Sequence, residues 1–351
     1  MRRLKKLVCL ASLSIMVMLS GCAGKEAEEK LTEGDSLLKE EKYEDAIAAY
    51  HEVISLGKHL QEAYRGSGIA YLKLDMYKEA ETEFKYALLE CNGKIGKTEQ
   101  DISYYLAETQ LRNGDLEEAI ETYSHLIEIE DKNPDLYFMR GVAYLRNGQL
   151  DEAIEGFEYK LKADPNNYDS YYQICLLLNE AGETEKSVEY ANRGLQTEGG
   201  EEKEYYFGVL DFFVGDYEGA ITYLSTEAAH QKADAYMYLG EAYEKTGDYD
   251  KAFEAYQTYM EQTQDANPQI YASMGEYYMN QKNYEQALEC FQKGLEIAGE
   301  GEKQRLLYGE AVAYEYLLDF DTAREKLEAY LAEYPDDANA LRDKRFLQGE
   351  E

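Results

Sequence analysis

Tryptophan is absent from the 351 residues, and the chain has only four prolines, four histidines and five cysteines. The histidines have no HExxH or CxxC companion, so neither a zinc site nor a nucleophile–base pair is indicated. Two cysteines fall in the first 22 residues, and Cys91, Cys175 and Cys290 are too scattered for a disulfide framework, so we expect three buried or half-buried thiols. We expect no catalytic residue, metal site or cofactor.

Positive charge is also in short supply. The chain has 36 basic and 71 acidic residues, a net charge of −35, and this excess disfavours nucleic acid as a partner. Solvated outer helix faces explain most of the acidic residues. A second interpretation stays open, in which acidic clusters attract cationic partners or divalent ions, although none has the spacing of a calcium loop. Without a pocket that raises one pKa, the many carboxylate pairs do not indicate acid–base catalysis, so we expect no enzyme.

The first 22 residues differ from the rest of the chain. Four basic residues precede an apolar run from Leu7 to Leu19, and a small-residue stretch ends at Cys22. This order is typical of an export signal, and the 13-residue run is short of the roughly 20 residues that a transmembrane anchor needs. The sequence Leu19-Ser20-Gly21-Cys22 resembles the lipobox of bacterial lipoproteins.

That resemblance implies that residues 1–21 are a signal peptide, removed before Cys22, and that the sulfur of Cys22 carries a diacylglyceryl group. Residues 22–26 would then be a lipidated N-terminus and short linker. Two acyl chains hold a protein firmly at a membrane. We therefore expect a lipid-anchored protein on the extracytoplasmic face of the cell membrane, or of the outer membrane in a host with two membranes.

The remaining chain is repetitive. The segment from Pro134 to Asn167 defines a 34-residue unit, and other copies fall into register with it. We number the positions of this repeat 1 to 34. Position 8 is small in every copy, as Gly34, Gly68, Ala107, Gly141, Cys175, Gly208, Gly240, Gly275 and Ala311. Position 24 is bulky in all but one, as Tyr50, Phe84, Tyr123, Phe157, Leu224, Tyr256, Phe291 and Leu327, with Ala191 the exception. Two helices should nearly touch there.

Each repeat is predicted to be a helical hairpin. Positions 4, 7, 8 and 11 share one side of a helix, and positions 20, 24, 27 and 28 share one side of a second helix. The intervening NGD, NGQ and TGD turns at 113–115, 147–149 and 246–248 place glycine where a left-handed C-cap is needed. All four prolines, Pro134, Pro165, Pro268 and Pro335, lie between hairpins. The chain is therefore predicted to be all-α.

The pattern resembles the tetratricopeptide repeat, whose characteristic residues match here as Tyr137, Gly141, Tyr144, Ala153, Phe157 and Pro165. The resemblance implies a right-handed α-solenoid of about nine hairpins over residues 27–337, followed by a capping segment at 338–351. The sixth repeat departs from the pattern with Asp211 at position 11 and Glu227 at position 27, and we interpret it as a bend or weak joint.

In the resembling family the first helices line a concave groove. Positions 5, 9 and 12 of the third to sixth repeats give an apolar stripe of ten residues, which we predict to be the partner groove: Tyr104, Leu111, Phe138, Val142, Leu145, Tyr172, Leu176, Tyr205, Val209 and Phe212. Its acidic shoulders are Asp35, Glu241, Glu244, Glu276 and Glu315. An alternative stays open, in which these side chains are buried within the solenoid itself. The family's carboxylate clamp is only partly matched, by Arg65, Ile69 and Lys73, so that activity is not carried over.

These features favour a non-enzymatic scaffold or adaptor that binds other cell-envelope proteins or peptides, resembling tetratricopeptide lipoproteins of envelope assembly. One alternative is a ligand-capture lipoprotein for a peptide or glycan, although the lack of tryptophan weakens the glycan version. Another is a non-catalytic partner subunit of an envelope protease or wall enzyme. The membrane contact would be made through lipidated Cys22.

Overall fold

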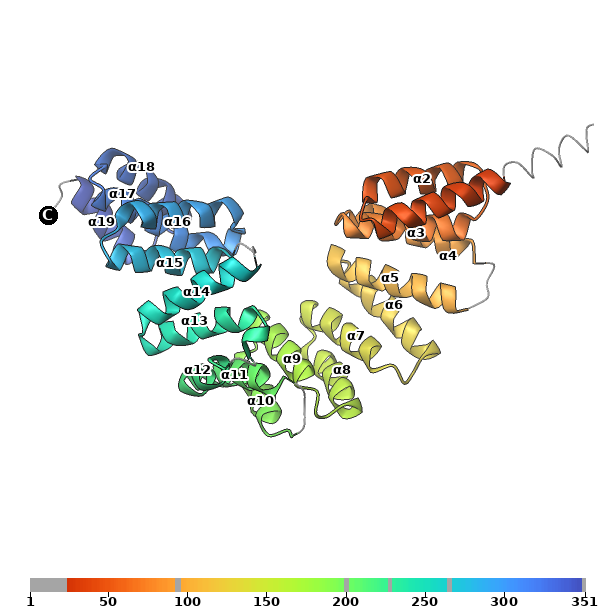
Figure 1. Ribbon diagram of the computed structural model, residues 1–351, viewed down its shortest axis with the longest axis horizontal. Coiled ribbons are helices and arrows are strands. Elements are labelled where there is room, and N and C mark those ends of the chain that lie inside the picture. The colour runs from red at the N-terminus through yellow and green to blue at the C-terminus, as the bar shows by residue number, and fades with distance from the viewer. Residues whose placement is uncertain (1–23, 92–95, 199–201, 227–228, 264–266, 349–351) are drawn as a thin grey trace, which may run out of the picture. The chain divides into compact units, whose positions relative to one another are not determined.

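The computed structural model describes residues 24–91, 96–198, 202–226, 229–263 and 267–348. The described residues are helical hairpins joined by short turns and contain no strand (Figure 1). The predicted signal peptide and Cys22, the predicted lipidation site, lie outside them. The chain divides into two compact units, residues 1–165 and 166–351, which we describe separately.

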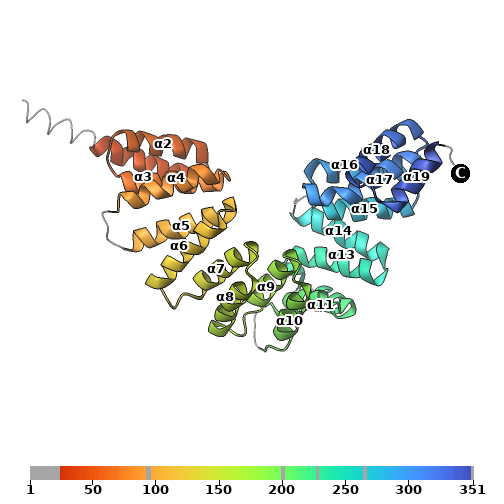
Figure 2. The ribbon, with the colours of Figure 1, turned by 180° about the vertical axis from the view of Figure 1, so that it is seen from behind.

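In the part of the first unit that the structure describes, the helices form four hairpins. Figure 2 shows them from behind. Residues 24–39 are helical, so the first helix includes residues 24–26, which the sequence assigned to a linker. Lys25 pairs with Glu29 one turn on, and Ala27 is fully buried, which helps to hold this early start in the helix. The helices that follow are α2 (Tyr43–Ser55), α3 (Leu60–Lys73), α4 (Tyr77–Leu89), α5 (Lys97–Asn113), α6 (Leu116–Ile129), α7 (Pro134–Arg146) and α8 (Leu150–Ala163).

The second unit contains five hairpins and a final single helix within the described ranges. The hairpin helices are α9 (Tyr168–Glu180), α10 (Thr184–Leu195), α11 (Lys203–Val214), α12 (Tyr217–Leu224), α13 (Asp234–Thr246), α14 (Tyr249–Thr263), α15 (Pro268–Asn280), α16 (Tyr284–Ile297), α17 (Lys303–Tyr316) and α18 (Phe320–Glu333). Helix α19 (Ala338–Gln348) lies in the segment predicted to be a cap, and two 3-10 turns, Ala229–Gln231 and Glu300–Glu302, precede α13 and α17.

The predicted close approach at position 8 is confirmed. A Cβ atom added to Gly68 would lie 2.7 Å from the Phe84 ring, and one added to Gly240 would lie 2.5 Å from the Tyr256 ring. Real Cβ contacts are not this short, so in these two hairpins a larger residue would force the ring or the helix to shift. The bulky residues at position 24 are buried accordingly, with Tyr50, Phe84 and Phe157 wholly inaccessible to solvent.

The turn within each hairpin has one backbone conformation. Position 15 has a positive φ in all nine described hairpins, including the predicted glycines Gly114, Gly148 and Gly247, whose φ values are 85°, 76° and 84°. In four hairpins the same conformation is adopted without glycine, by Glu41, Asp75, Lys282 and Leu318. Between hairpins, Pro134 and Pro268 occupy the first turns of α7 and α15, where a missing N–H does no harm.

The sixth hairpin departs from the others, as the sequence indicated. Its second helix, α12, has 8 residues, whereas the other second helices have 12 to 15. Asp211 is 8% exposed, and burial, reinforced by nearby Asp216, raises its pKa to about 6. Glu227 lies outside the described residues. The three cysteines that the structure describes, Cys91, Cys175 and Cys290, are free thiols, of which two are buried and Cys91 is half-buried.

Candidate partner-binding surfaces

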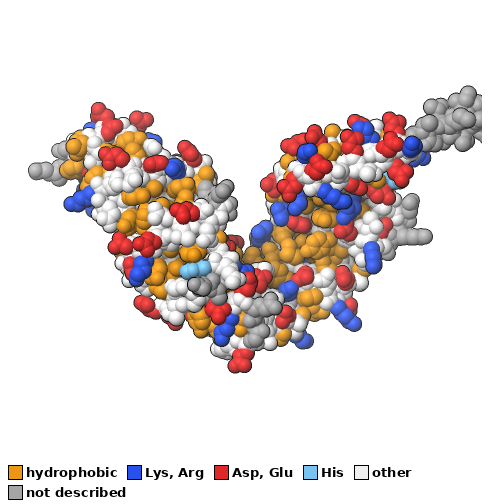
Figure 3. All heavy atoms as spheres, viewed as in Figure 1, with side chains coloured by type: hydrophobic (Ala, Val, Ile, Leu, Met, Phe, Trp, Pro, Cys, Tyr) orange, Lys and Arg blue, Asp and Glu red, His pale blue; other side chains and the backbone are white. Residues whose placement is uncertain are grey.

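The face of the first helices, defined by positions 2, 5, 9 and 12, carries the predicted partner stripe. Figure 3 shows hydrophobic side chains gathered over α5 and α7 in the first unit. Four of the five stripe residues there are buried, with 5–8% of their surface exposed: Leu111, Phe138, Val142 and Leu145. Tyr104 differs, because 37% of its surface is exposed. It is the accessible member of the stripe in the first unit.

The ring of Tyr104 is held in place by a contact with the second helix of its hairpin. Its ring meets the fully buried ring of Tyr123 edge to face, with centroids 6.5 Å apart and an interplanar angle of 84°. Beside it, Arg112 pairs with Glu108 at 2.9 Å on the same helix. Partial burial raises the pKa of Tyr104, so its hydroxyl stays protonated at neutral pH. The result is a fixed aromatic ring next to a paired charge.

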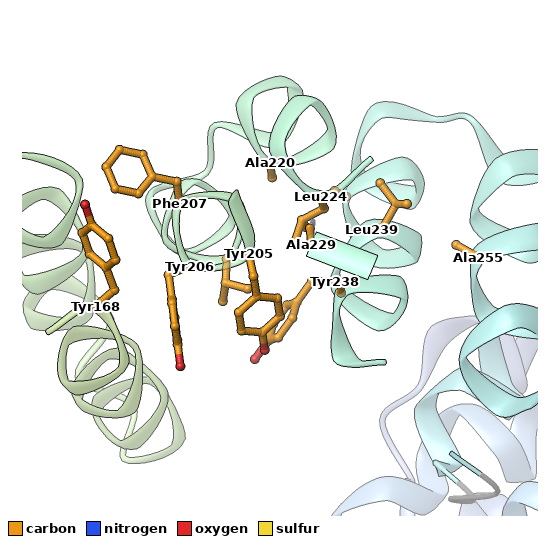
Figure 4. Packing of buried hydrophobic residues seen from close by; sticks show 13 residues of the cluster. Tyr168, Tyr205, Tyr206, Phe207, Ala220, Leu224, Ala229, Tyr238, Leu239 and Ala255 are labelled. Atoms are coloured by element: carbon orange, nitrogen blue, oxygen red, sulfur yellow. The ribbon is translucent and has the colours of Figure 1, made fainter. Parts of the chain in front are cut away.

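In the second unit the stripe packs largely against itself. Tyr205 and Val209 are 4% and 0% exposed, while Tyr172, Leu176 and Phe212 are half-buried. Figure 4 shows Tyr205 beside Tyr238, with Tyr206 between Tyr205 and Tyr168.

Aromatic contacts and hydroxyl groups hold these tyrosine side chains of the second unit together. The hydroxyls of Tyr172 and Tyr238 lie 3.2 Å apart, within hydrogen-bond range. Lys232 lies over the rings of Tyr205 and Tyr206, 5.1 Å from each centroid, and pairs with Glu202 at 2.9 Å. Burial raises the pKa of Tyr206 to about 12. Much of this part of the stripe is therefore engaged in the protein's own packing, and its role in binding stays a prediction.

The acidic shoulders have different surroundings. Asp35 accepts a hydrogen bond from the Tyr50 hydroxyl at 2.8 Å, and Glu276 forms a two-pronged pair with Arg305 at 3.0 and 2.9 Å. Glu241 has no hydrogen-bond or ion-pair partner among the described residues, and burial, with the charge of Glu244, raises its pKa to about 7. Burial also raises the pKa of Glu315.

A relation between positions 9 and 24 of the repeat escaped sequence reasoning. Three repeats have tyrosine at position 24, and each has an acidic residue at position 9: Asp35 with Tyr50, Glu108 with Tyr123, and Glu241 with Tyr256. The pKa of each tyrosine is raised, mainly by burial and also by the nearby carboxylate. Where position 24 is phenylalanine, leucine or alanine, position 9 is aliphatic in every repeat but the eighth, which has Glu276. Comparing the two columns of the repeat would have found this pattern.

The partial carboxylate clamp is further weakened by the structure. Arg65 pairs with Asp101 at 2.5 Å, and its guanidinium lies 5.5 Å from the centroid of the Tyr105 ring. Ile69 is 8% exposed. A cavity of about 390 Å³ adjoins Arg65, but Asp35, Glu62 and Asp101 share its lining with Lys97. This mixed lining does not favour an acidic ligand.

One cluster has the residue types of a hydrolase triad without its geometry. The Ser67 hydroxyl lies 3.3 Å from Nε2 of His51, and the Glu83 carboxylate lies 3.6 Å from the same nitrogen. In a working triad the two partners use different ring nitrogens, so that the histidine moves a proton from one side to the other. Ser67 is also fully buried, away from any substrate. Among the residues that the structure describes, no group of histidine, cysteine and acidic side chains has the arrangement of a metal site.

No described helix combines the length and the apolar character needed to cross a bilayer. Cys22, the predicted lipidation site, lies outside the described residues. The anchor therefore stays a prediction from the sequence.

Family models match most of the chain. One described as "Tetratricopeptide repeat" matches residues 31–94, 138–200 and 208–269. Two further models of the same description match 268–300 and 305–337, and one described as "TPR repeat" matches 108–148. No curated protein matches the chain.

The chain is similar to solved structures, of which one supports the fold with a TM-score above 0.5. A tetratricopeptide repeat protein from Parabacteroides merdae is 16% identical, with a TM-score of 0.52 over 72% of this chain and 98% of that one. The Pseudomonas aeruginosa pilF protein is 15% identical, with a TM-score of 0.46 over 72% of this chain and 97% of that one. YrrB, described as having an unusual peptide-binding site, is 25% identical, with a TM-score of 0.41 over 49% of this chain and 87% of its own.

Proposed function

Because this chain belongs to the tetratricopeptide repeat family, we propose that it is a non-enzymatic scaffold, tethered by lipid at Cys22 to the outer face of a bacterial membrane. It holds other envelope proteins against the face formed by the first helices of its hairpins. Repeats of this family indicate a scaffold for protein–protein interaction. The lipid tether at Cys22 and the envelope location of the partners are the further content of the proposal.

The accessible ring of Tyr104 carries this proposal. Positions 8 and 24 maintain the close contact between the two helices of a hairpin, and position 15 keeps one backbone conformation in the turn. In the third repeat, position 5 presents a large aromatic ring that is 37% exposed and is oriented by Tyr123. Rigid aromatic side chains on a stable surface are effective anchors for a protein partner, because little conformational entropy is lost on binding.

The binding role is tested by photo-crosslinking in intact cells. A benzoylphenylalanine at position 104 should give crosslinked products with envelope proteins. The matched control is Tyr86 on α4, which is 48% exposed but lies on a second helix. Products at 104 that are missing at 86 support the proposal. Equal products at both positions, or none at 104, contradict it.

The tether is tested separately with Cys22→Ser. This change should abolish labelling by a clickable palmitate analogue and release the protein from the membrane fraction. A Cys91→Ser variant, which alters a half-buried thiol, should keep both properties. Retention of the Cys22→Ser protein in the membrane fraction would contradict lipid anchoring.

A further inference from the structure

An open cavity in the second unit has the lining of a cation site. It measures about 620 Å³ and lies between the turn that joins α13 to α14 and the second half of α15. A smaller cavity of about 40 Å³ shares four of its lining residues and extends it inward. The shared residues are Tyr249, Glu276, Tyr277 and Asn280.

Acidic side chains line this pair of cavities, and no lysine, arginine or histidine does. The four carboxylates are Glu244, Asp248, Asp250 and Glu276. The negative charges of two of them are compensated by ion pairs: Asp248 pairs with Lys251 at 2.6 Å, and Glu276 pairs with Arg305.

The other two have no ion pair of their own, although Glu244 interacts with the Tyr256 hydroxyl and with the charge of Arg305. Asp250 accepts a hydrogen bond from the neutral Tyr277 hydroxyl at 3.0 Å, and neither Asp250 nor Glu244 has an ion pair within the described ranges. The cavities therefore have negative charge in excess.

Aromatic rings stand beside these carboxylates. The Tyr277 ring stacks on Phe253 with centroids 4.3 Å apart, which fixes it at the wall of the cavity. Tyr249, at the cavity mouth, is 56% exposed.

Of the four tyrosines at position 17 in other repeats, three have ring or hydroxyl partners that Tyr249 lacks, and the fourth, Tyr43, is half-buried against the core of the first hairpin. Tyr77 donates a hydrogen bond to Asp75, Tyr217 meets Phe212 edge to face, and Tyr284 stacks on Tyr316. In the part of the chain that the structure describes, Tyr249 has no ring contact and no hydroxyl hydrogen bond. Its ring face is free for a ligand.

We propose that this α14–α15 pocket, defined by Asp248, Tyr249, Asp250, Glu276 and Tyr277, binds a lysine or arginine side chain from a basic segment of a protein partner. The ammonium or guanidinium group lies over the Tyr249 ring and donates a hydrogen bond to Asp250. This inference rests on the proposed scaffold function and adds the chemistry of the partner. The chain's net charge of −35 brings a basic segment toward it, and the pocket fixes the segment's position.

The test uses the purified full-length protein and a fluorescein-labelled hexa-arginine peptide, with fluorescence anisotropy measured in 150 mM salt. Tyr249→Leu, which removes the π face and keeps bulk, should weaken binding about threefold, and Tyr249→Phe should bind as the parent does. Asp250→Asn should weaken binding by a similar factor. Hexa-glutamate should not bind.

Two control variants separate the pocket from general charge attraction. Tyr86→Leu removes an exposed ring in the first unit, and Asp336→Asn removes one exposed charge from the second unit. Both should bind within 1.5-fold of the parent. Equal weakening in the controls and the pocket variants, or no weakening at Tyr249 and Asp250, would overturn the proposal.

Circular dichroism of each variant distinguishes unfolding from loss of the site. Retained binding by Tyr249→Phe is a second check that the fold is intact. The outcome is also independent of the crosslinking at position 104, which tests the first unit in cells. Specific capture at 104 with no effect at Tyr249 would reject the cation pocket and leave the scaffold standing. Weakened peptide binding in the Tyr249 and Asp250 variants, without specific crosslinking at 104, would support the pocket and reject the first-helix face as the partner surface.

Discussion

The first-helix faces of the two units differ although the same repeat builds both. In the third repeat, position 5 is Tyr104, whose ring is 37% exposed. In the sixth repeat, position 5 is Tyr205, whose ring is 4% exposed and lies among Tyr172, Tyr206 and Tyr238. Identical side chains at identical positions therefore become either a surface feature or part of a core. The neighbours on the adjacent first helices decide which.

Truncation should separate these two tyrosines most strongly. Tyr205→Ala removes a buried ring and Lys232's cation–π contact, so we expect a loss of about 3–5 kcal/mol in the free energy of unfolding of the second unit. Tyr104→Ala should cost only about 1 kcal/mol. Hydrogen exchange measured on peptides from α5 and α11 reads each unit separately. Similar losses at both positions would remove the contrast.

Hydroxyl deletion tests the relation between positions 9 and 24. Tyr50→Phe removes a hydrogen bond to Asp35, and we expect it to destabilise the first unit by about 1–2 kcal/mol. Tyr123→Phe should be neutral or stabilising, because the buried Tyr123 hydroxyl has no hydrogen-bond partner. Urea unfolding followed by circular dichroism measures both changes. A larger loss of stability for Tyr123→Phe than for Tyr50→Phe would contradict a stabilising hydrogen bond between Tyr50 and Asp35.

Position 15 offers a smaller test in two turns of the second unit. Leu318 has a φ of 64° and is 73% exposed, so Leu318→Gly relieves backbone strain while little packing is lost. We expect a gain of about 0.5–1 kcal/mol. Gly247→Ala, which places a side chain at a φ of 84°, should lose about 1 kcal/mol. Thermal melting of both variants checks these opposite signs.

A pH dependence of stability is also expected, and it belongs to the second unit. The pKa values of Asp211 and Glu241 are raised to about 6 and about 7, above their ordinary values of 3.8 and 4.5. The folded state thus holds protons that the unfolded state releases, and the contribution of these two groups to stability falls as pH rises from about 4 to about 7.

The double variant Asp211→Asn/Glu241→Gln should lack this decline. Its stability relative to the parent should therefore increase between pH 5 and pH 7, as measured by urea unfolding at several pH values. A difference that stays constant across that range would refute the assignment.

Much of the fold could be predicted from the sequence because packing fixes its residue types. A small residue such as Gly68 is predictable opposite a bulky one such as Phe84, because a Cβ atom at residue 68 would lie 2.7 Å from that ring. Helical periodicity and the prolines then give the hairpins, and Asp211 at a core position marked the irregular sixth repeat. The left-handed conformation of Leu318 was not predictable, because nothing in leucine favours it and the rest of the hairpin imposes it.

The candidate sites were less accessible to sequence reasoning. Position in the repeat identified the stripe, but the exposure of Tyr104 and the burial of Tyr205 depend on neighbours more than 30 residues away, such as Tyr238. The α14–α15 pocket depends on what Tyr249 lacks, which is visible only when ring contacts are known. Periodicity gives the direction of a side chain and not what covers it.

One consequence follows from the turn conformation that all nine described hairpins share at position 15. The joint between paired helices is interchangeable, since glycine, leucine, lysine, aspartate and glutamate all satisfy it. A gene for such a protein can gain or lose a whole module by duplication or deletion without inventing a new connection, and the joint itself is free to drift in sequence while its geometry persists.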